Sequence, residues 1–102
     1  MALSIDINNN TENRAWEICL IGEVDISNVH EFKEQIETAL AKVEQNILID
    51  LSGLDYIDST GLGIIIGVYS SIKDKGLTIK VANPGDSIKK LINITGLDKI
   101  LY

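Results

Sequence analysis

The stretch ILIDLSGLDYIDSTGLGIII, residues 47–66, decides the fold of this chain. Its first five residues, 47–51, form a short and almost continuous apolar run. Such a run is typical of a strand that is buried on both faces, as in parallel sheets. The segment 52–58 that follows contains serine, glycine and two aspartates, and it predicts a loop. The stretch therefore opens with a buried strand and a connecting loop.

A largely apolar helix is expected next, from Ser59 or Thr60 to Lys75. Asp58 can cap its N-terminus, because a carboxylate accepts hydrogen bonds from the free backbone N–H groups of a first turn. The helix contains three glycines, Gly61, Gly63 and Gly67. Each glycine costs the helix about 1 kcal/mol relative to alanine. We therefore expect these glycines to allow a close approach between the helix and its neighbours.

The N-terminal half predicts an antiparallel hairpin and one amphipathic helix. Residues 3–8 and 16–21 alternate apolar and polar side chains, and a polar turn joins the two segments. Gly22 is expected to end the second strand. Ser27 or Asn28 can cap the next helix, whose apolar stripe is expected to face the sheet. The stripe consists of Val29, Phe32, Ile36, Ala39, Leu40 and Val43.

The rest of the chain predicts one more strand and a closing helix. Residues 77–82 predict the strand, 83–86 a turn, and Ser87 the start of the helix, which Gly96 ends. The resulting order, β-β-α-β-α-β-α, is typical of an α/β protein, with a mixed sheet because a hairpin opens the chain. Right-handed crossovers put the first two helices on one face only if the strand order advances in one direction. We expect that arrangement, with residues 47–51 in a central strand.

The length of 102 residues suits a single domain spanning residues 1–102, without repeats or linkers. The one cysteine, Cys19, excludes an intrachain disulfide and indicates the reducing cytosol. Residues 1–6 lack the features of a signal peptide. The longest nearly apolar stretch, 61–69, is far shorter than the ~20 residues of a membrane span. The sequence thus predicts a cytoplasmic protein that does not engage a membrane.

Charge is distributed unevenly along the chain. Residues 1–51 carry 3 basic and 10 acidic side chains, residues 52–102 carry 6 and 5, and the net charge is −6. An acidic half repels phosphate backbones, and the aromatic residues are too few for a base-stacking surface. We therefore expect no nucleic-acid partner. The acidity either keeps the protein soluble or meets a protein partner that carries basic groups.

Two segments partly match motifs for cofactor binding and catalysis, but the spacing of their residues differs from those motifs. The sequence GLG at 61–63 opens a dinucleotide fingerprint, but the third glycine falls one residue too late. The sequence DSTG at 58–61 has one residue too many for an aspartic protease. His30 is expected to be solvated and Cys19 to be packed in a strand, so no transition-metal site is expected. These observations predict no enzyme, no cofactor and no metal.

Four segments point to a family. They are GEVD at 22–25, ILIDLS at 47–52, YIDSTGLG at 56–63 and ITGLDKI at 94–100. Together they resemble the anti-sigma factor antagonists, the bacterial branch of the STAS domain family. The resemblance spans nearly the whole chain, and the block DSTGLG is its most specific part. One departure is Val24, where leucine is common.

The resemblance implies a single STAS domain, a mixed sheet of four or five strands with helices packed mainly on one face. It implies that Ser59 is phosphorylated by a partner kinase, which is itself the anti-sigma factor. The unphosphorylated form binds that kinase and frees a sigma factor, and a serine phosphatase resets the switch. The chain ends soon after Ile100, so the longer final helix of the family is expected to be truncated.

The resemblance also implies a partner-binding surface around Ser59. The surface comprises Glu23, Asp25, Asp58, Ser59, Thr60, Gly61 and Leu62. We expect Asp25 to lie close to Ser59 and to help present it, the alternative being that Asp25 caps the first helix. From spacing alone, Asp58 and Ser59 could likewise serve only as helix caps.

Two other functions remain open for a STAS domain. One is constitutive binding of a partner, such as a transporter subunit, and the other is nucleotide or lipid binding. A small acidic body with one exposed hydroxyl at a helix start, and without catalytic groups, favours a switch. We expect the protein to be a monomer on its own.

Overall fold

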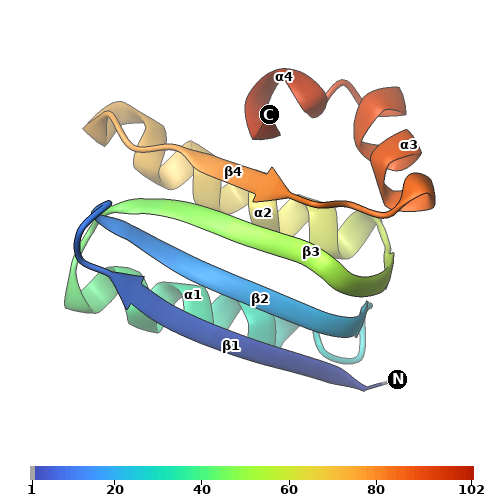
Figure 1. The fold of residues 1–102 in the computed structure, drawn as a ribbon, viewed down its shortest axis with the longest axis horizontal. Coiled ribbons are helices and arrows are strands. Elements are labelled where there is room, and N and C mark those ends of the chain that lie inside the picture. The colour runs from blue at the N-terminus through green and yellow to red at the C-terminus, as the bar shows by residue number, and fades with distance from the viewer. Residues whose placement is uncertain (1) are drawn as a thin grey trace.

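The computed structural model describes residues 2–102 (Figure 1). Its strands are β1 (Leu3–Asn10), β2 (Ala15–Val24), β3 (Asn46–Ile57) and β4 (Ile79–Ala82). Its helices are α1 (Val29–Lys42), α2 (Ser59–Ile72), the 3-10 turn η1 (Lys73–Lys75), α3 (Asp86–Ile94) and α4 (Asp98–Leu101). The predicted order β-β-α-β-α-β-α is confirmed, and the short helix α4 follows it.

The sheet is mixed and has the strand order β1-β2-β3-β4. β1 and β2 pair antiparallel, whereas β3 pairs parallel with both β2 and β4. Because β3 lies between two strands, the expected interior place of residues 47–51 is confirmed. The order advances in one direction, and α1 and α2 lie together behind the sheet in Figure 1. The packing of these helices on one face is therefore also confirmed.

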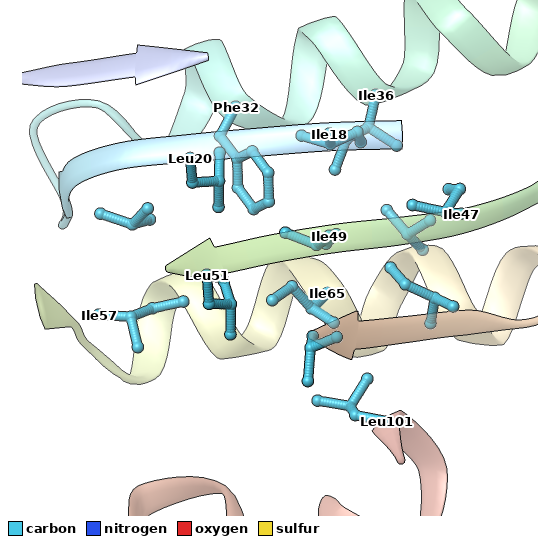
Figure 2. Close-up of a cluster of buried hydrophobic side chains, with 14 of the residues drawn as sticks. Ile18, Leu20, Phe32, Ile36, Ile47, Ile49, Leu51, Ile57, Ile65 and Leu101 are labelled. Atoms are coloured by element: carbon cyan, nitrogen blue, oxygen red, sulfur yellow. The ribbon is translucent and has the colours of Figure 1, made fainter. Parts of the chain in front are cut away.

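The core lies between the sheet and helices α1 and α2 (Figure 2). Leu20 on β2, Phe32 on α1 and Ile49 on β3 have no exposed surface. Alternate residues of each strand face this core, and residues spaced by three or four face it from the helices. Burial of each such side chain contributes about 1.5–3 kcal/mol to stability.

The opposite face of the sheet is not covered by α1 or α2. Leu48 and Asp50 on β3 are only half-buried, as is Cys19 on β2. The prediction that the strand at 47–51 is buried on both faces is therefore wrong. The neighbouring strands shield Leu48 in part, and this partial shielding is enough to favour an apolar residue there.

β2 and β3 extend further than the sequence predicted. The segment 52–57, predicted as a loop, belongs to β3, and β2 continues past Gly22 to Val24. The register shifts twice along this part of the ladder, and Gly22 has a φ of 106°, which favours glycine. Backbone pairing thus prevails over the polar composition of the segment. It carries both strands to the edge of the sheet where the candidate site lies.

Other boundaries differ by one or two residues. β4 begins at Ile79 instead of residue 77, and α3 begins at Asp86 instead of Ser87. The helix expected to reach Lys75 is confirmed as α2 followed by η1. Among the residues that the structure describes, no helix is long and apolar enough to cross a membrane.

The three glycines of α2 differ in their surroundings. A Cβ atom at Gly61 would lie 2.7 Å from Ile57 Cγ1 and 2.8 Å from Val24 Cγ1. A Cβ atom at Gly63 or Gly67 would meet no atom of its surroundings within 4 Å. The expected close approach is confirmed at Gly61 and is wrong for the other two, which have open space beside them.

Candidate functional site

The carboxyl ends of β2 and β3 meet at one edge of the sheet. These strands are parallel, and their ladder ends with Val24 opposite Ile57. The backbone N–H of Asp58 then donates to the carbonyl of Val24 over 3.3 Å. Asp25 and Asp58, which follow the two strands, therefore emerge side by side. This edge is the usual place for binding sites in open α/β sheets.

Asp58 connects β3 to α2 as the N-cap residue of the helix. Its Oδ1 accepts from the backbone N–H of Thr60 over 3.0 Å and from that of Gly61 over 3.1 Å. The Thr60 hydroxyl donates to the same oxygen. These bonds lower the pKa of Asp58, the Thr60 hydroxyl having the largest effect and desolvation opposing it. The predicted cap is confirmed, and the cap favours the ionised form of Asp58.

Asp25 makes a turn of the same kind after β2. Its Oδ1 accepts from the backbone N–H of Ser27 over 2.9 Å and from the Ser27 hydroxyl. The Ser27 hydroxyl is the largest cause of the lowered pKa of Asp25, which desolvation and the charge of Asp58 oppose. The two carboxylates are thus close enough to repel each other. The structure brings Asp25 beside the residue that precedes Ser59.

The residues between β2 and α1 do not cap that helix with their side chains. Asn28 holds the N-cap position, and its side chain makes no cap hydrogen bond within residues 2–102. Asn28 Nδ2 instead donates to the carbonyl of Glu23 over 2.9 Å, and Oδ1 accepts from the Asp25 N–H over 3.0 Å. The predicted N-cap position is therefore confirmed at Asn28, whereas capping by its side chain is wrong. The Asn28 side chain fastens the turn to the end of β2, whereas the Ser27 hydroxyl bonds to Asp25 within the turn. Among residues 2–102, the bonds made by the Asp25 carboxylate also stay within the turn.

Ser59 is the first residue of α2 and is exposed. The other two serine and threonine hydroxyls at this edge, those of Ser27 and Thr60, each donate to an aspartate. The Ser59 hydroxyl has no hydrogen-bond partner in the part of the chain that the structure describes. Of the three hydroxyls, that of Ser59 is the one available to react with an external group.

Gly61 and Leu62 lie behind the exposed turn. Gly61 is buried, and Leu62 is only 6% exposed. The other five residues predicted for the surface are half-buried or exposed: Glu23, Asp25, Asp58, Ser59 and Thr60. The structure thus gathers all seven residues at one edge, where Gly61 and Leu62 hold the start of α2 beneath the turn.

The edge around Ser59 is acidic. The segments 21–28 and 55–62 contain Glu23, Asp25, Asp55 and Asp58 and neither lysine nor arginine. Within residues 2–102, no three His, Cys, Asp or Glu side chains lie close enough together to hold a metal ion. The arrangement suits a surface that attracts the basic groups of a partner and offers it the unengaged hydroxyl of Ser59.

The sequence analysis missed Ile26, which lies between Asp25 and Ser27 and is 74% exposed. A sequence pattern marks the turn that holds it, although not its exposure. An aspartate followed two positions later by a hydroxyl residue occurs at 25–27, 50–52 and 58–60. The triplets at 25–27 and 58–60 directly follow a strand and form equivalent turns, whereas 50–52 lies inside β3.

Comparison with known proteins establishes the family. The STAS domain model matches residues 6–101. The chain belongs to the STAS domain family. It is 31% identical over 101 residues to the anti-sigma-B factor antagonist of Bacillus subtilis (strain 168), covering 99% of this chain and 90% of that protein. It is 26% identical over 100 residues to the anti-sigma-B factor antagonist of Staphylococcus aureus (strain NCTC 8325 / PS 47), covering 98% and 93%.

Solved structures share the fold of this STAS domain. The anti-sigma factor antagonist SpoIIAA in its unphosphorylated form has a TM-score of 0.82 at 24% identity, covering 97% of this chain and 86% of that one. The Bacillus cell fate determinant SpoIIAA in the phosphorylated form has a TM-score of 0.75 at 24% identity, covering 97% and 89%. The family and the STAS-like fold expected from the sequence are thereby confirmed.

Proposed function

We propose that this protein is an anti-sigma factor antagonist that acts by partner switching. In its unphosphorylated form it binds an anti-sigma factor, a serine kinase, so that a sigma factor is released. The kinase phosphorylates Ser59, which ends the binding, and a serine phosphatase restores it. The single STAS domain of residues 1–102 carries this function as a cytosolic monomer. It needs no catalysis, cofactor, nucleic acid or membrane of its own.

The free hydroxyl of Ser59 is the observation that carries the proposal. In phosphoryl transfer a hydroxyl oxygen attacks the γ-phosphorus of ATP, ADP leaves, and a base of the kinase takes the proton. Ser59 is exposed at the start of α2, and its hydroxyl is not engaged by its neighbours. Thr60 is exposed as well, but its hydroxyl donates to Asp58. Phosphorylation of Thr60 would remove the hydrogen bond from its hydroxyl to Asp58, whereas phosphorylation of Ser59 leaves that bond in place.

The relatives support the antagonist role. Two proteins named anti-sigma-B factor antagonist are 31% and 26% identical to this chain over nearly its whole length. The fold is shared with SpoIIAA in both its unphosphorylated and its phosphorylated form. Phosphorylation is therefore compatible with this fold in SpoIIAA, which supports a switch that acts at the interface with the partner.

Electrostatics explains how one phosphate could act there. A phosphate adds about −1.5 to −2 charges. The backbone N–H groups of Thr60 and Gly61 already donate to Asp58, so the attraction of the phosphate to the helix N-terminus is offset by its repulsion from that carboxylate. A partner docked on bare Ser59 would have to desolvate the new charge, which costs several kcal/mol when the charge is buried unpaired. Binding should therefore be lost without refolding of the domain.

Intact mass measured after incubation with the kinase and ATP tests the proposal. The wild-type protein should gain one phosphate, and Ser59→Ala should gain none while still binding the kinase. Thr60→Val is the matched control, because it removes the neighbouring hydroxyl and should still gain one phosphate. Failure of the wild type to gain phosphate would contradict the proposal and favour a constitutive binding module. Phosphate uptake that persists in Ser59→Ala would contradict the assignment of the site.

A further inference from the structure

Two turns at the carboxyl edge of the sheet share one construction. In residues 25–27 and 58–60, an aspartate Oδ1 accepts from the backbone N–H and the hydroxyl of the residue two positions later. The strands before the turns are paired in register up to Val24 and Ile57. Ile26 and Ser59 therefore occupy matching positions in neighbouring turns.

Ile26 is the most accessible of the three exposed large apolar or aromatic residues in the segments 21–28 and 55–62, the others being Ile21 and Tyr56. It is 74% exposed between Asp25 and Ser27. Three hydrogen bonds fix the backbone of its turn. The Ser27 N–H donates to the Asp25 carboxylate, and the Asn28 side chain bonds to the carbonyl of Glu23 and the N–H of Asp25. A single exposed isoleucine is ordinary in a folded protein. One that is held in a fixed turn beside a reactive hydroxyl is placed to contact whatever protein engages that hydroxyl.

We propose that Ile26 is the apolar anchor through which the unphosphorylated protein docks on its anti-sigma factor kinase, in an apolar pocket with a lysine- and arginine-rich rim. This inference rests on the proposed function. The charge of this edge favours a partner with a basic rim, because the segments 21–28 and 55–62 contain four acidic residues and no basic one. An apolar anchor inside a charged rim is also how the energetically dominant part of an interface is commonly built.

The position of the anchor connects affinity to the phosphorylation state. Once Ile26 is buried in the kinase, the neighbouring Ser59 lies inside the region from which water is excluded. A phosphate added there would place its charge in the desolvated contact. The contribution of Ile26 is apolar and insensitive to salt, whereas the contribution of the carboxylates weakens as salt screens them.

Titration calorimetry of the wild-type protein and three variants with the kinase tests the anchor. Ile26→Ser should weaken binding about tenfold or more, and by the same factor at low and high salt. Ile26→Leu keeps an apolar side chain and should bind within about threefold of the wild type. Ile94→Ser is the matched control, because Ile94, the last residue of α3, is 85% exposed and lies outside the segments 21–28 and 55–62, so its replacement should not affect binding. Thermal unfolding should be alike for all four proteins.

The outcomes separate the anchor from the proposed function. If the wild type gains phosphate at Ser59 and Ile26→Ser binds as tightly as the wild type, Ile26 is not an anchor, whereas the proposed phosphorylation switch is retained. An equal loss in Ile26→Ser and Ile94→Ser would also overturn the anchor. If the wild type neither binds the kinase nor gains phosphate, both proposals fall.

Discussion

The turn at residues 58–60 and the turn at residues 25–27 have the same hydrogen bonds and different consequences. Asp58 also accepts from the N–H of Gly61, so its turn is the cap of α2. Within residues 2–102, the carboxylate of Asp25 bonds only inside its turn, and α1 starts without a side-chain cap. The middle residue is serine in one turn and isoleucine in the other. The aspartates and the backbone set the shape of this edge, and the middle residues set its chemistry.

The largest effect on stability among these predictions is expected at Gly61, which packs the turn at 58–60 against the ends of β2 and β3. Gly61→Ala should lower the free energy of unfolding by about 1–3 kcal/mol, because the added Cβ would lie 2.7 Å from Ile57 Cγ1. Gly63→Ala, with open space around it, should raise that free energy by about 0.5–1 kcal/mol. Urea unfolding of both variants measures the difference, and equal effects would contradict the packing described for Gly61.

Replacing either aspartate tests whether the two turns have different roles. Asp58→Ala should lower the melting temperature more than Asp25→Ala does, because only Asp58 caps a helix. Asp25→Ala should instead weaken kinase binding and slow phosphorylation while the fold is retained. Thermal unfolding and a phosphorylation time course on the same samples separate these effects. An Asp25→Ala protein that melts early but is phosphorylated normally would show that Asp25 is only structural.

Acid should reveal a property that the turns share. The pKa values of Asp25 and Asp58 lie below their usual value of 3.8, each mainly because a hydroxyl donates to the carboxylate. A carboxyl whose pKa is lower in the folded state contributes stability that is present above the unfolded pKa and is lost as pH falls through the folded pKa. Stability should therefore fall as pH drops below about 3.8, and Asp58→Asn should fall less steeply. Urea midpoints along a pH series measure the slopes, and identical slopes would contradict the stabilisation ascribed to the Asp58 carboxylate.

Phosphorylation should have the smallest effect on the fold. The phosphate is attracted by the N-terminus of α2 and repelled by Asp58 and Asp25, and these opposing effects nearly cancel. The melting temperature of the phosphorylated protein should therefore stay close to that of the unphosphorylated protein. Calorimetry on the two forms measures the shift, and a large loss of thermal stability would indicate that the switch works by unfolding the edge.

Periodic patterns made most of the fold predictable from the sequence. The alternation in 3–8 and 16–21 and the apolar stripe of α1 fixed the elements, and Asp58 before an apolar helix marked the cap. The extension of β3 through 52–57 was not predictable in this way. Its polar residues resemble a loop, and only pairing with the end of β2 makes the segment a strand.

The site was predictable where a motif marks it and not where geometry decides. Resemblance pointed to Asp25, Asp58 and Ser59, and the structure gathers them at one edge. Asn28 resembles a helix cap in sequence, but its side chain reaches back to β2. Ile26 gives no periodic signal, because its exposure becomes known only from the folded turn.

The dissociation constant of the kinase for the Ser59-phosphorylated and the unphosphorylated protein tests the central claim most directly. The two forms should be prepared from one sample, with phosphate confirmed at Ser59 and equal melting temperatures established first. Phosphorylation should weaken binding by about a hundredfold or more, because the partner face that covers bare Ser59 cannot solvate the added charge. Equal dissociation constants for the two forms would contradict the account.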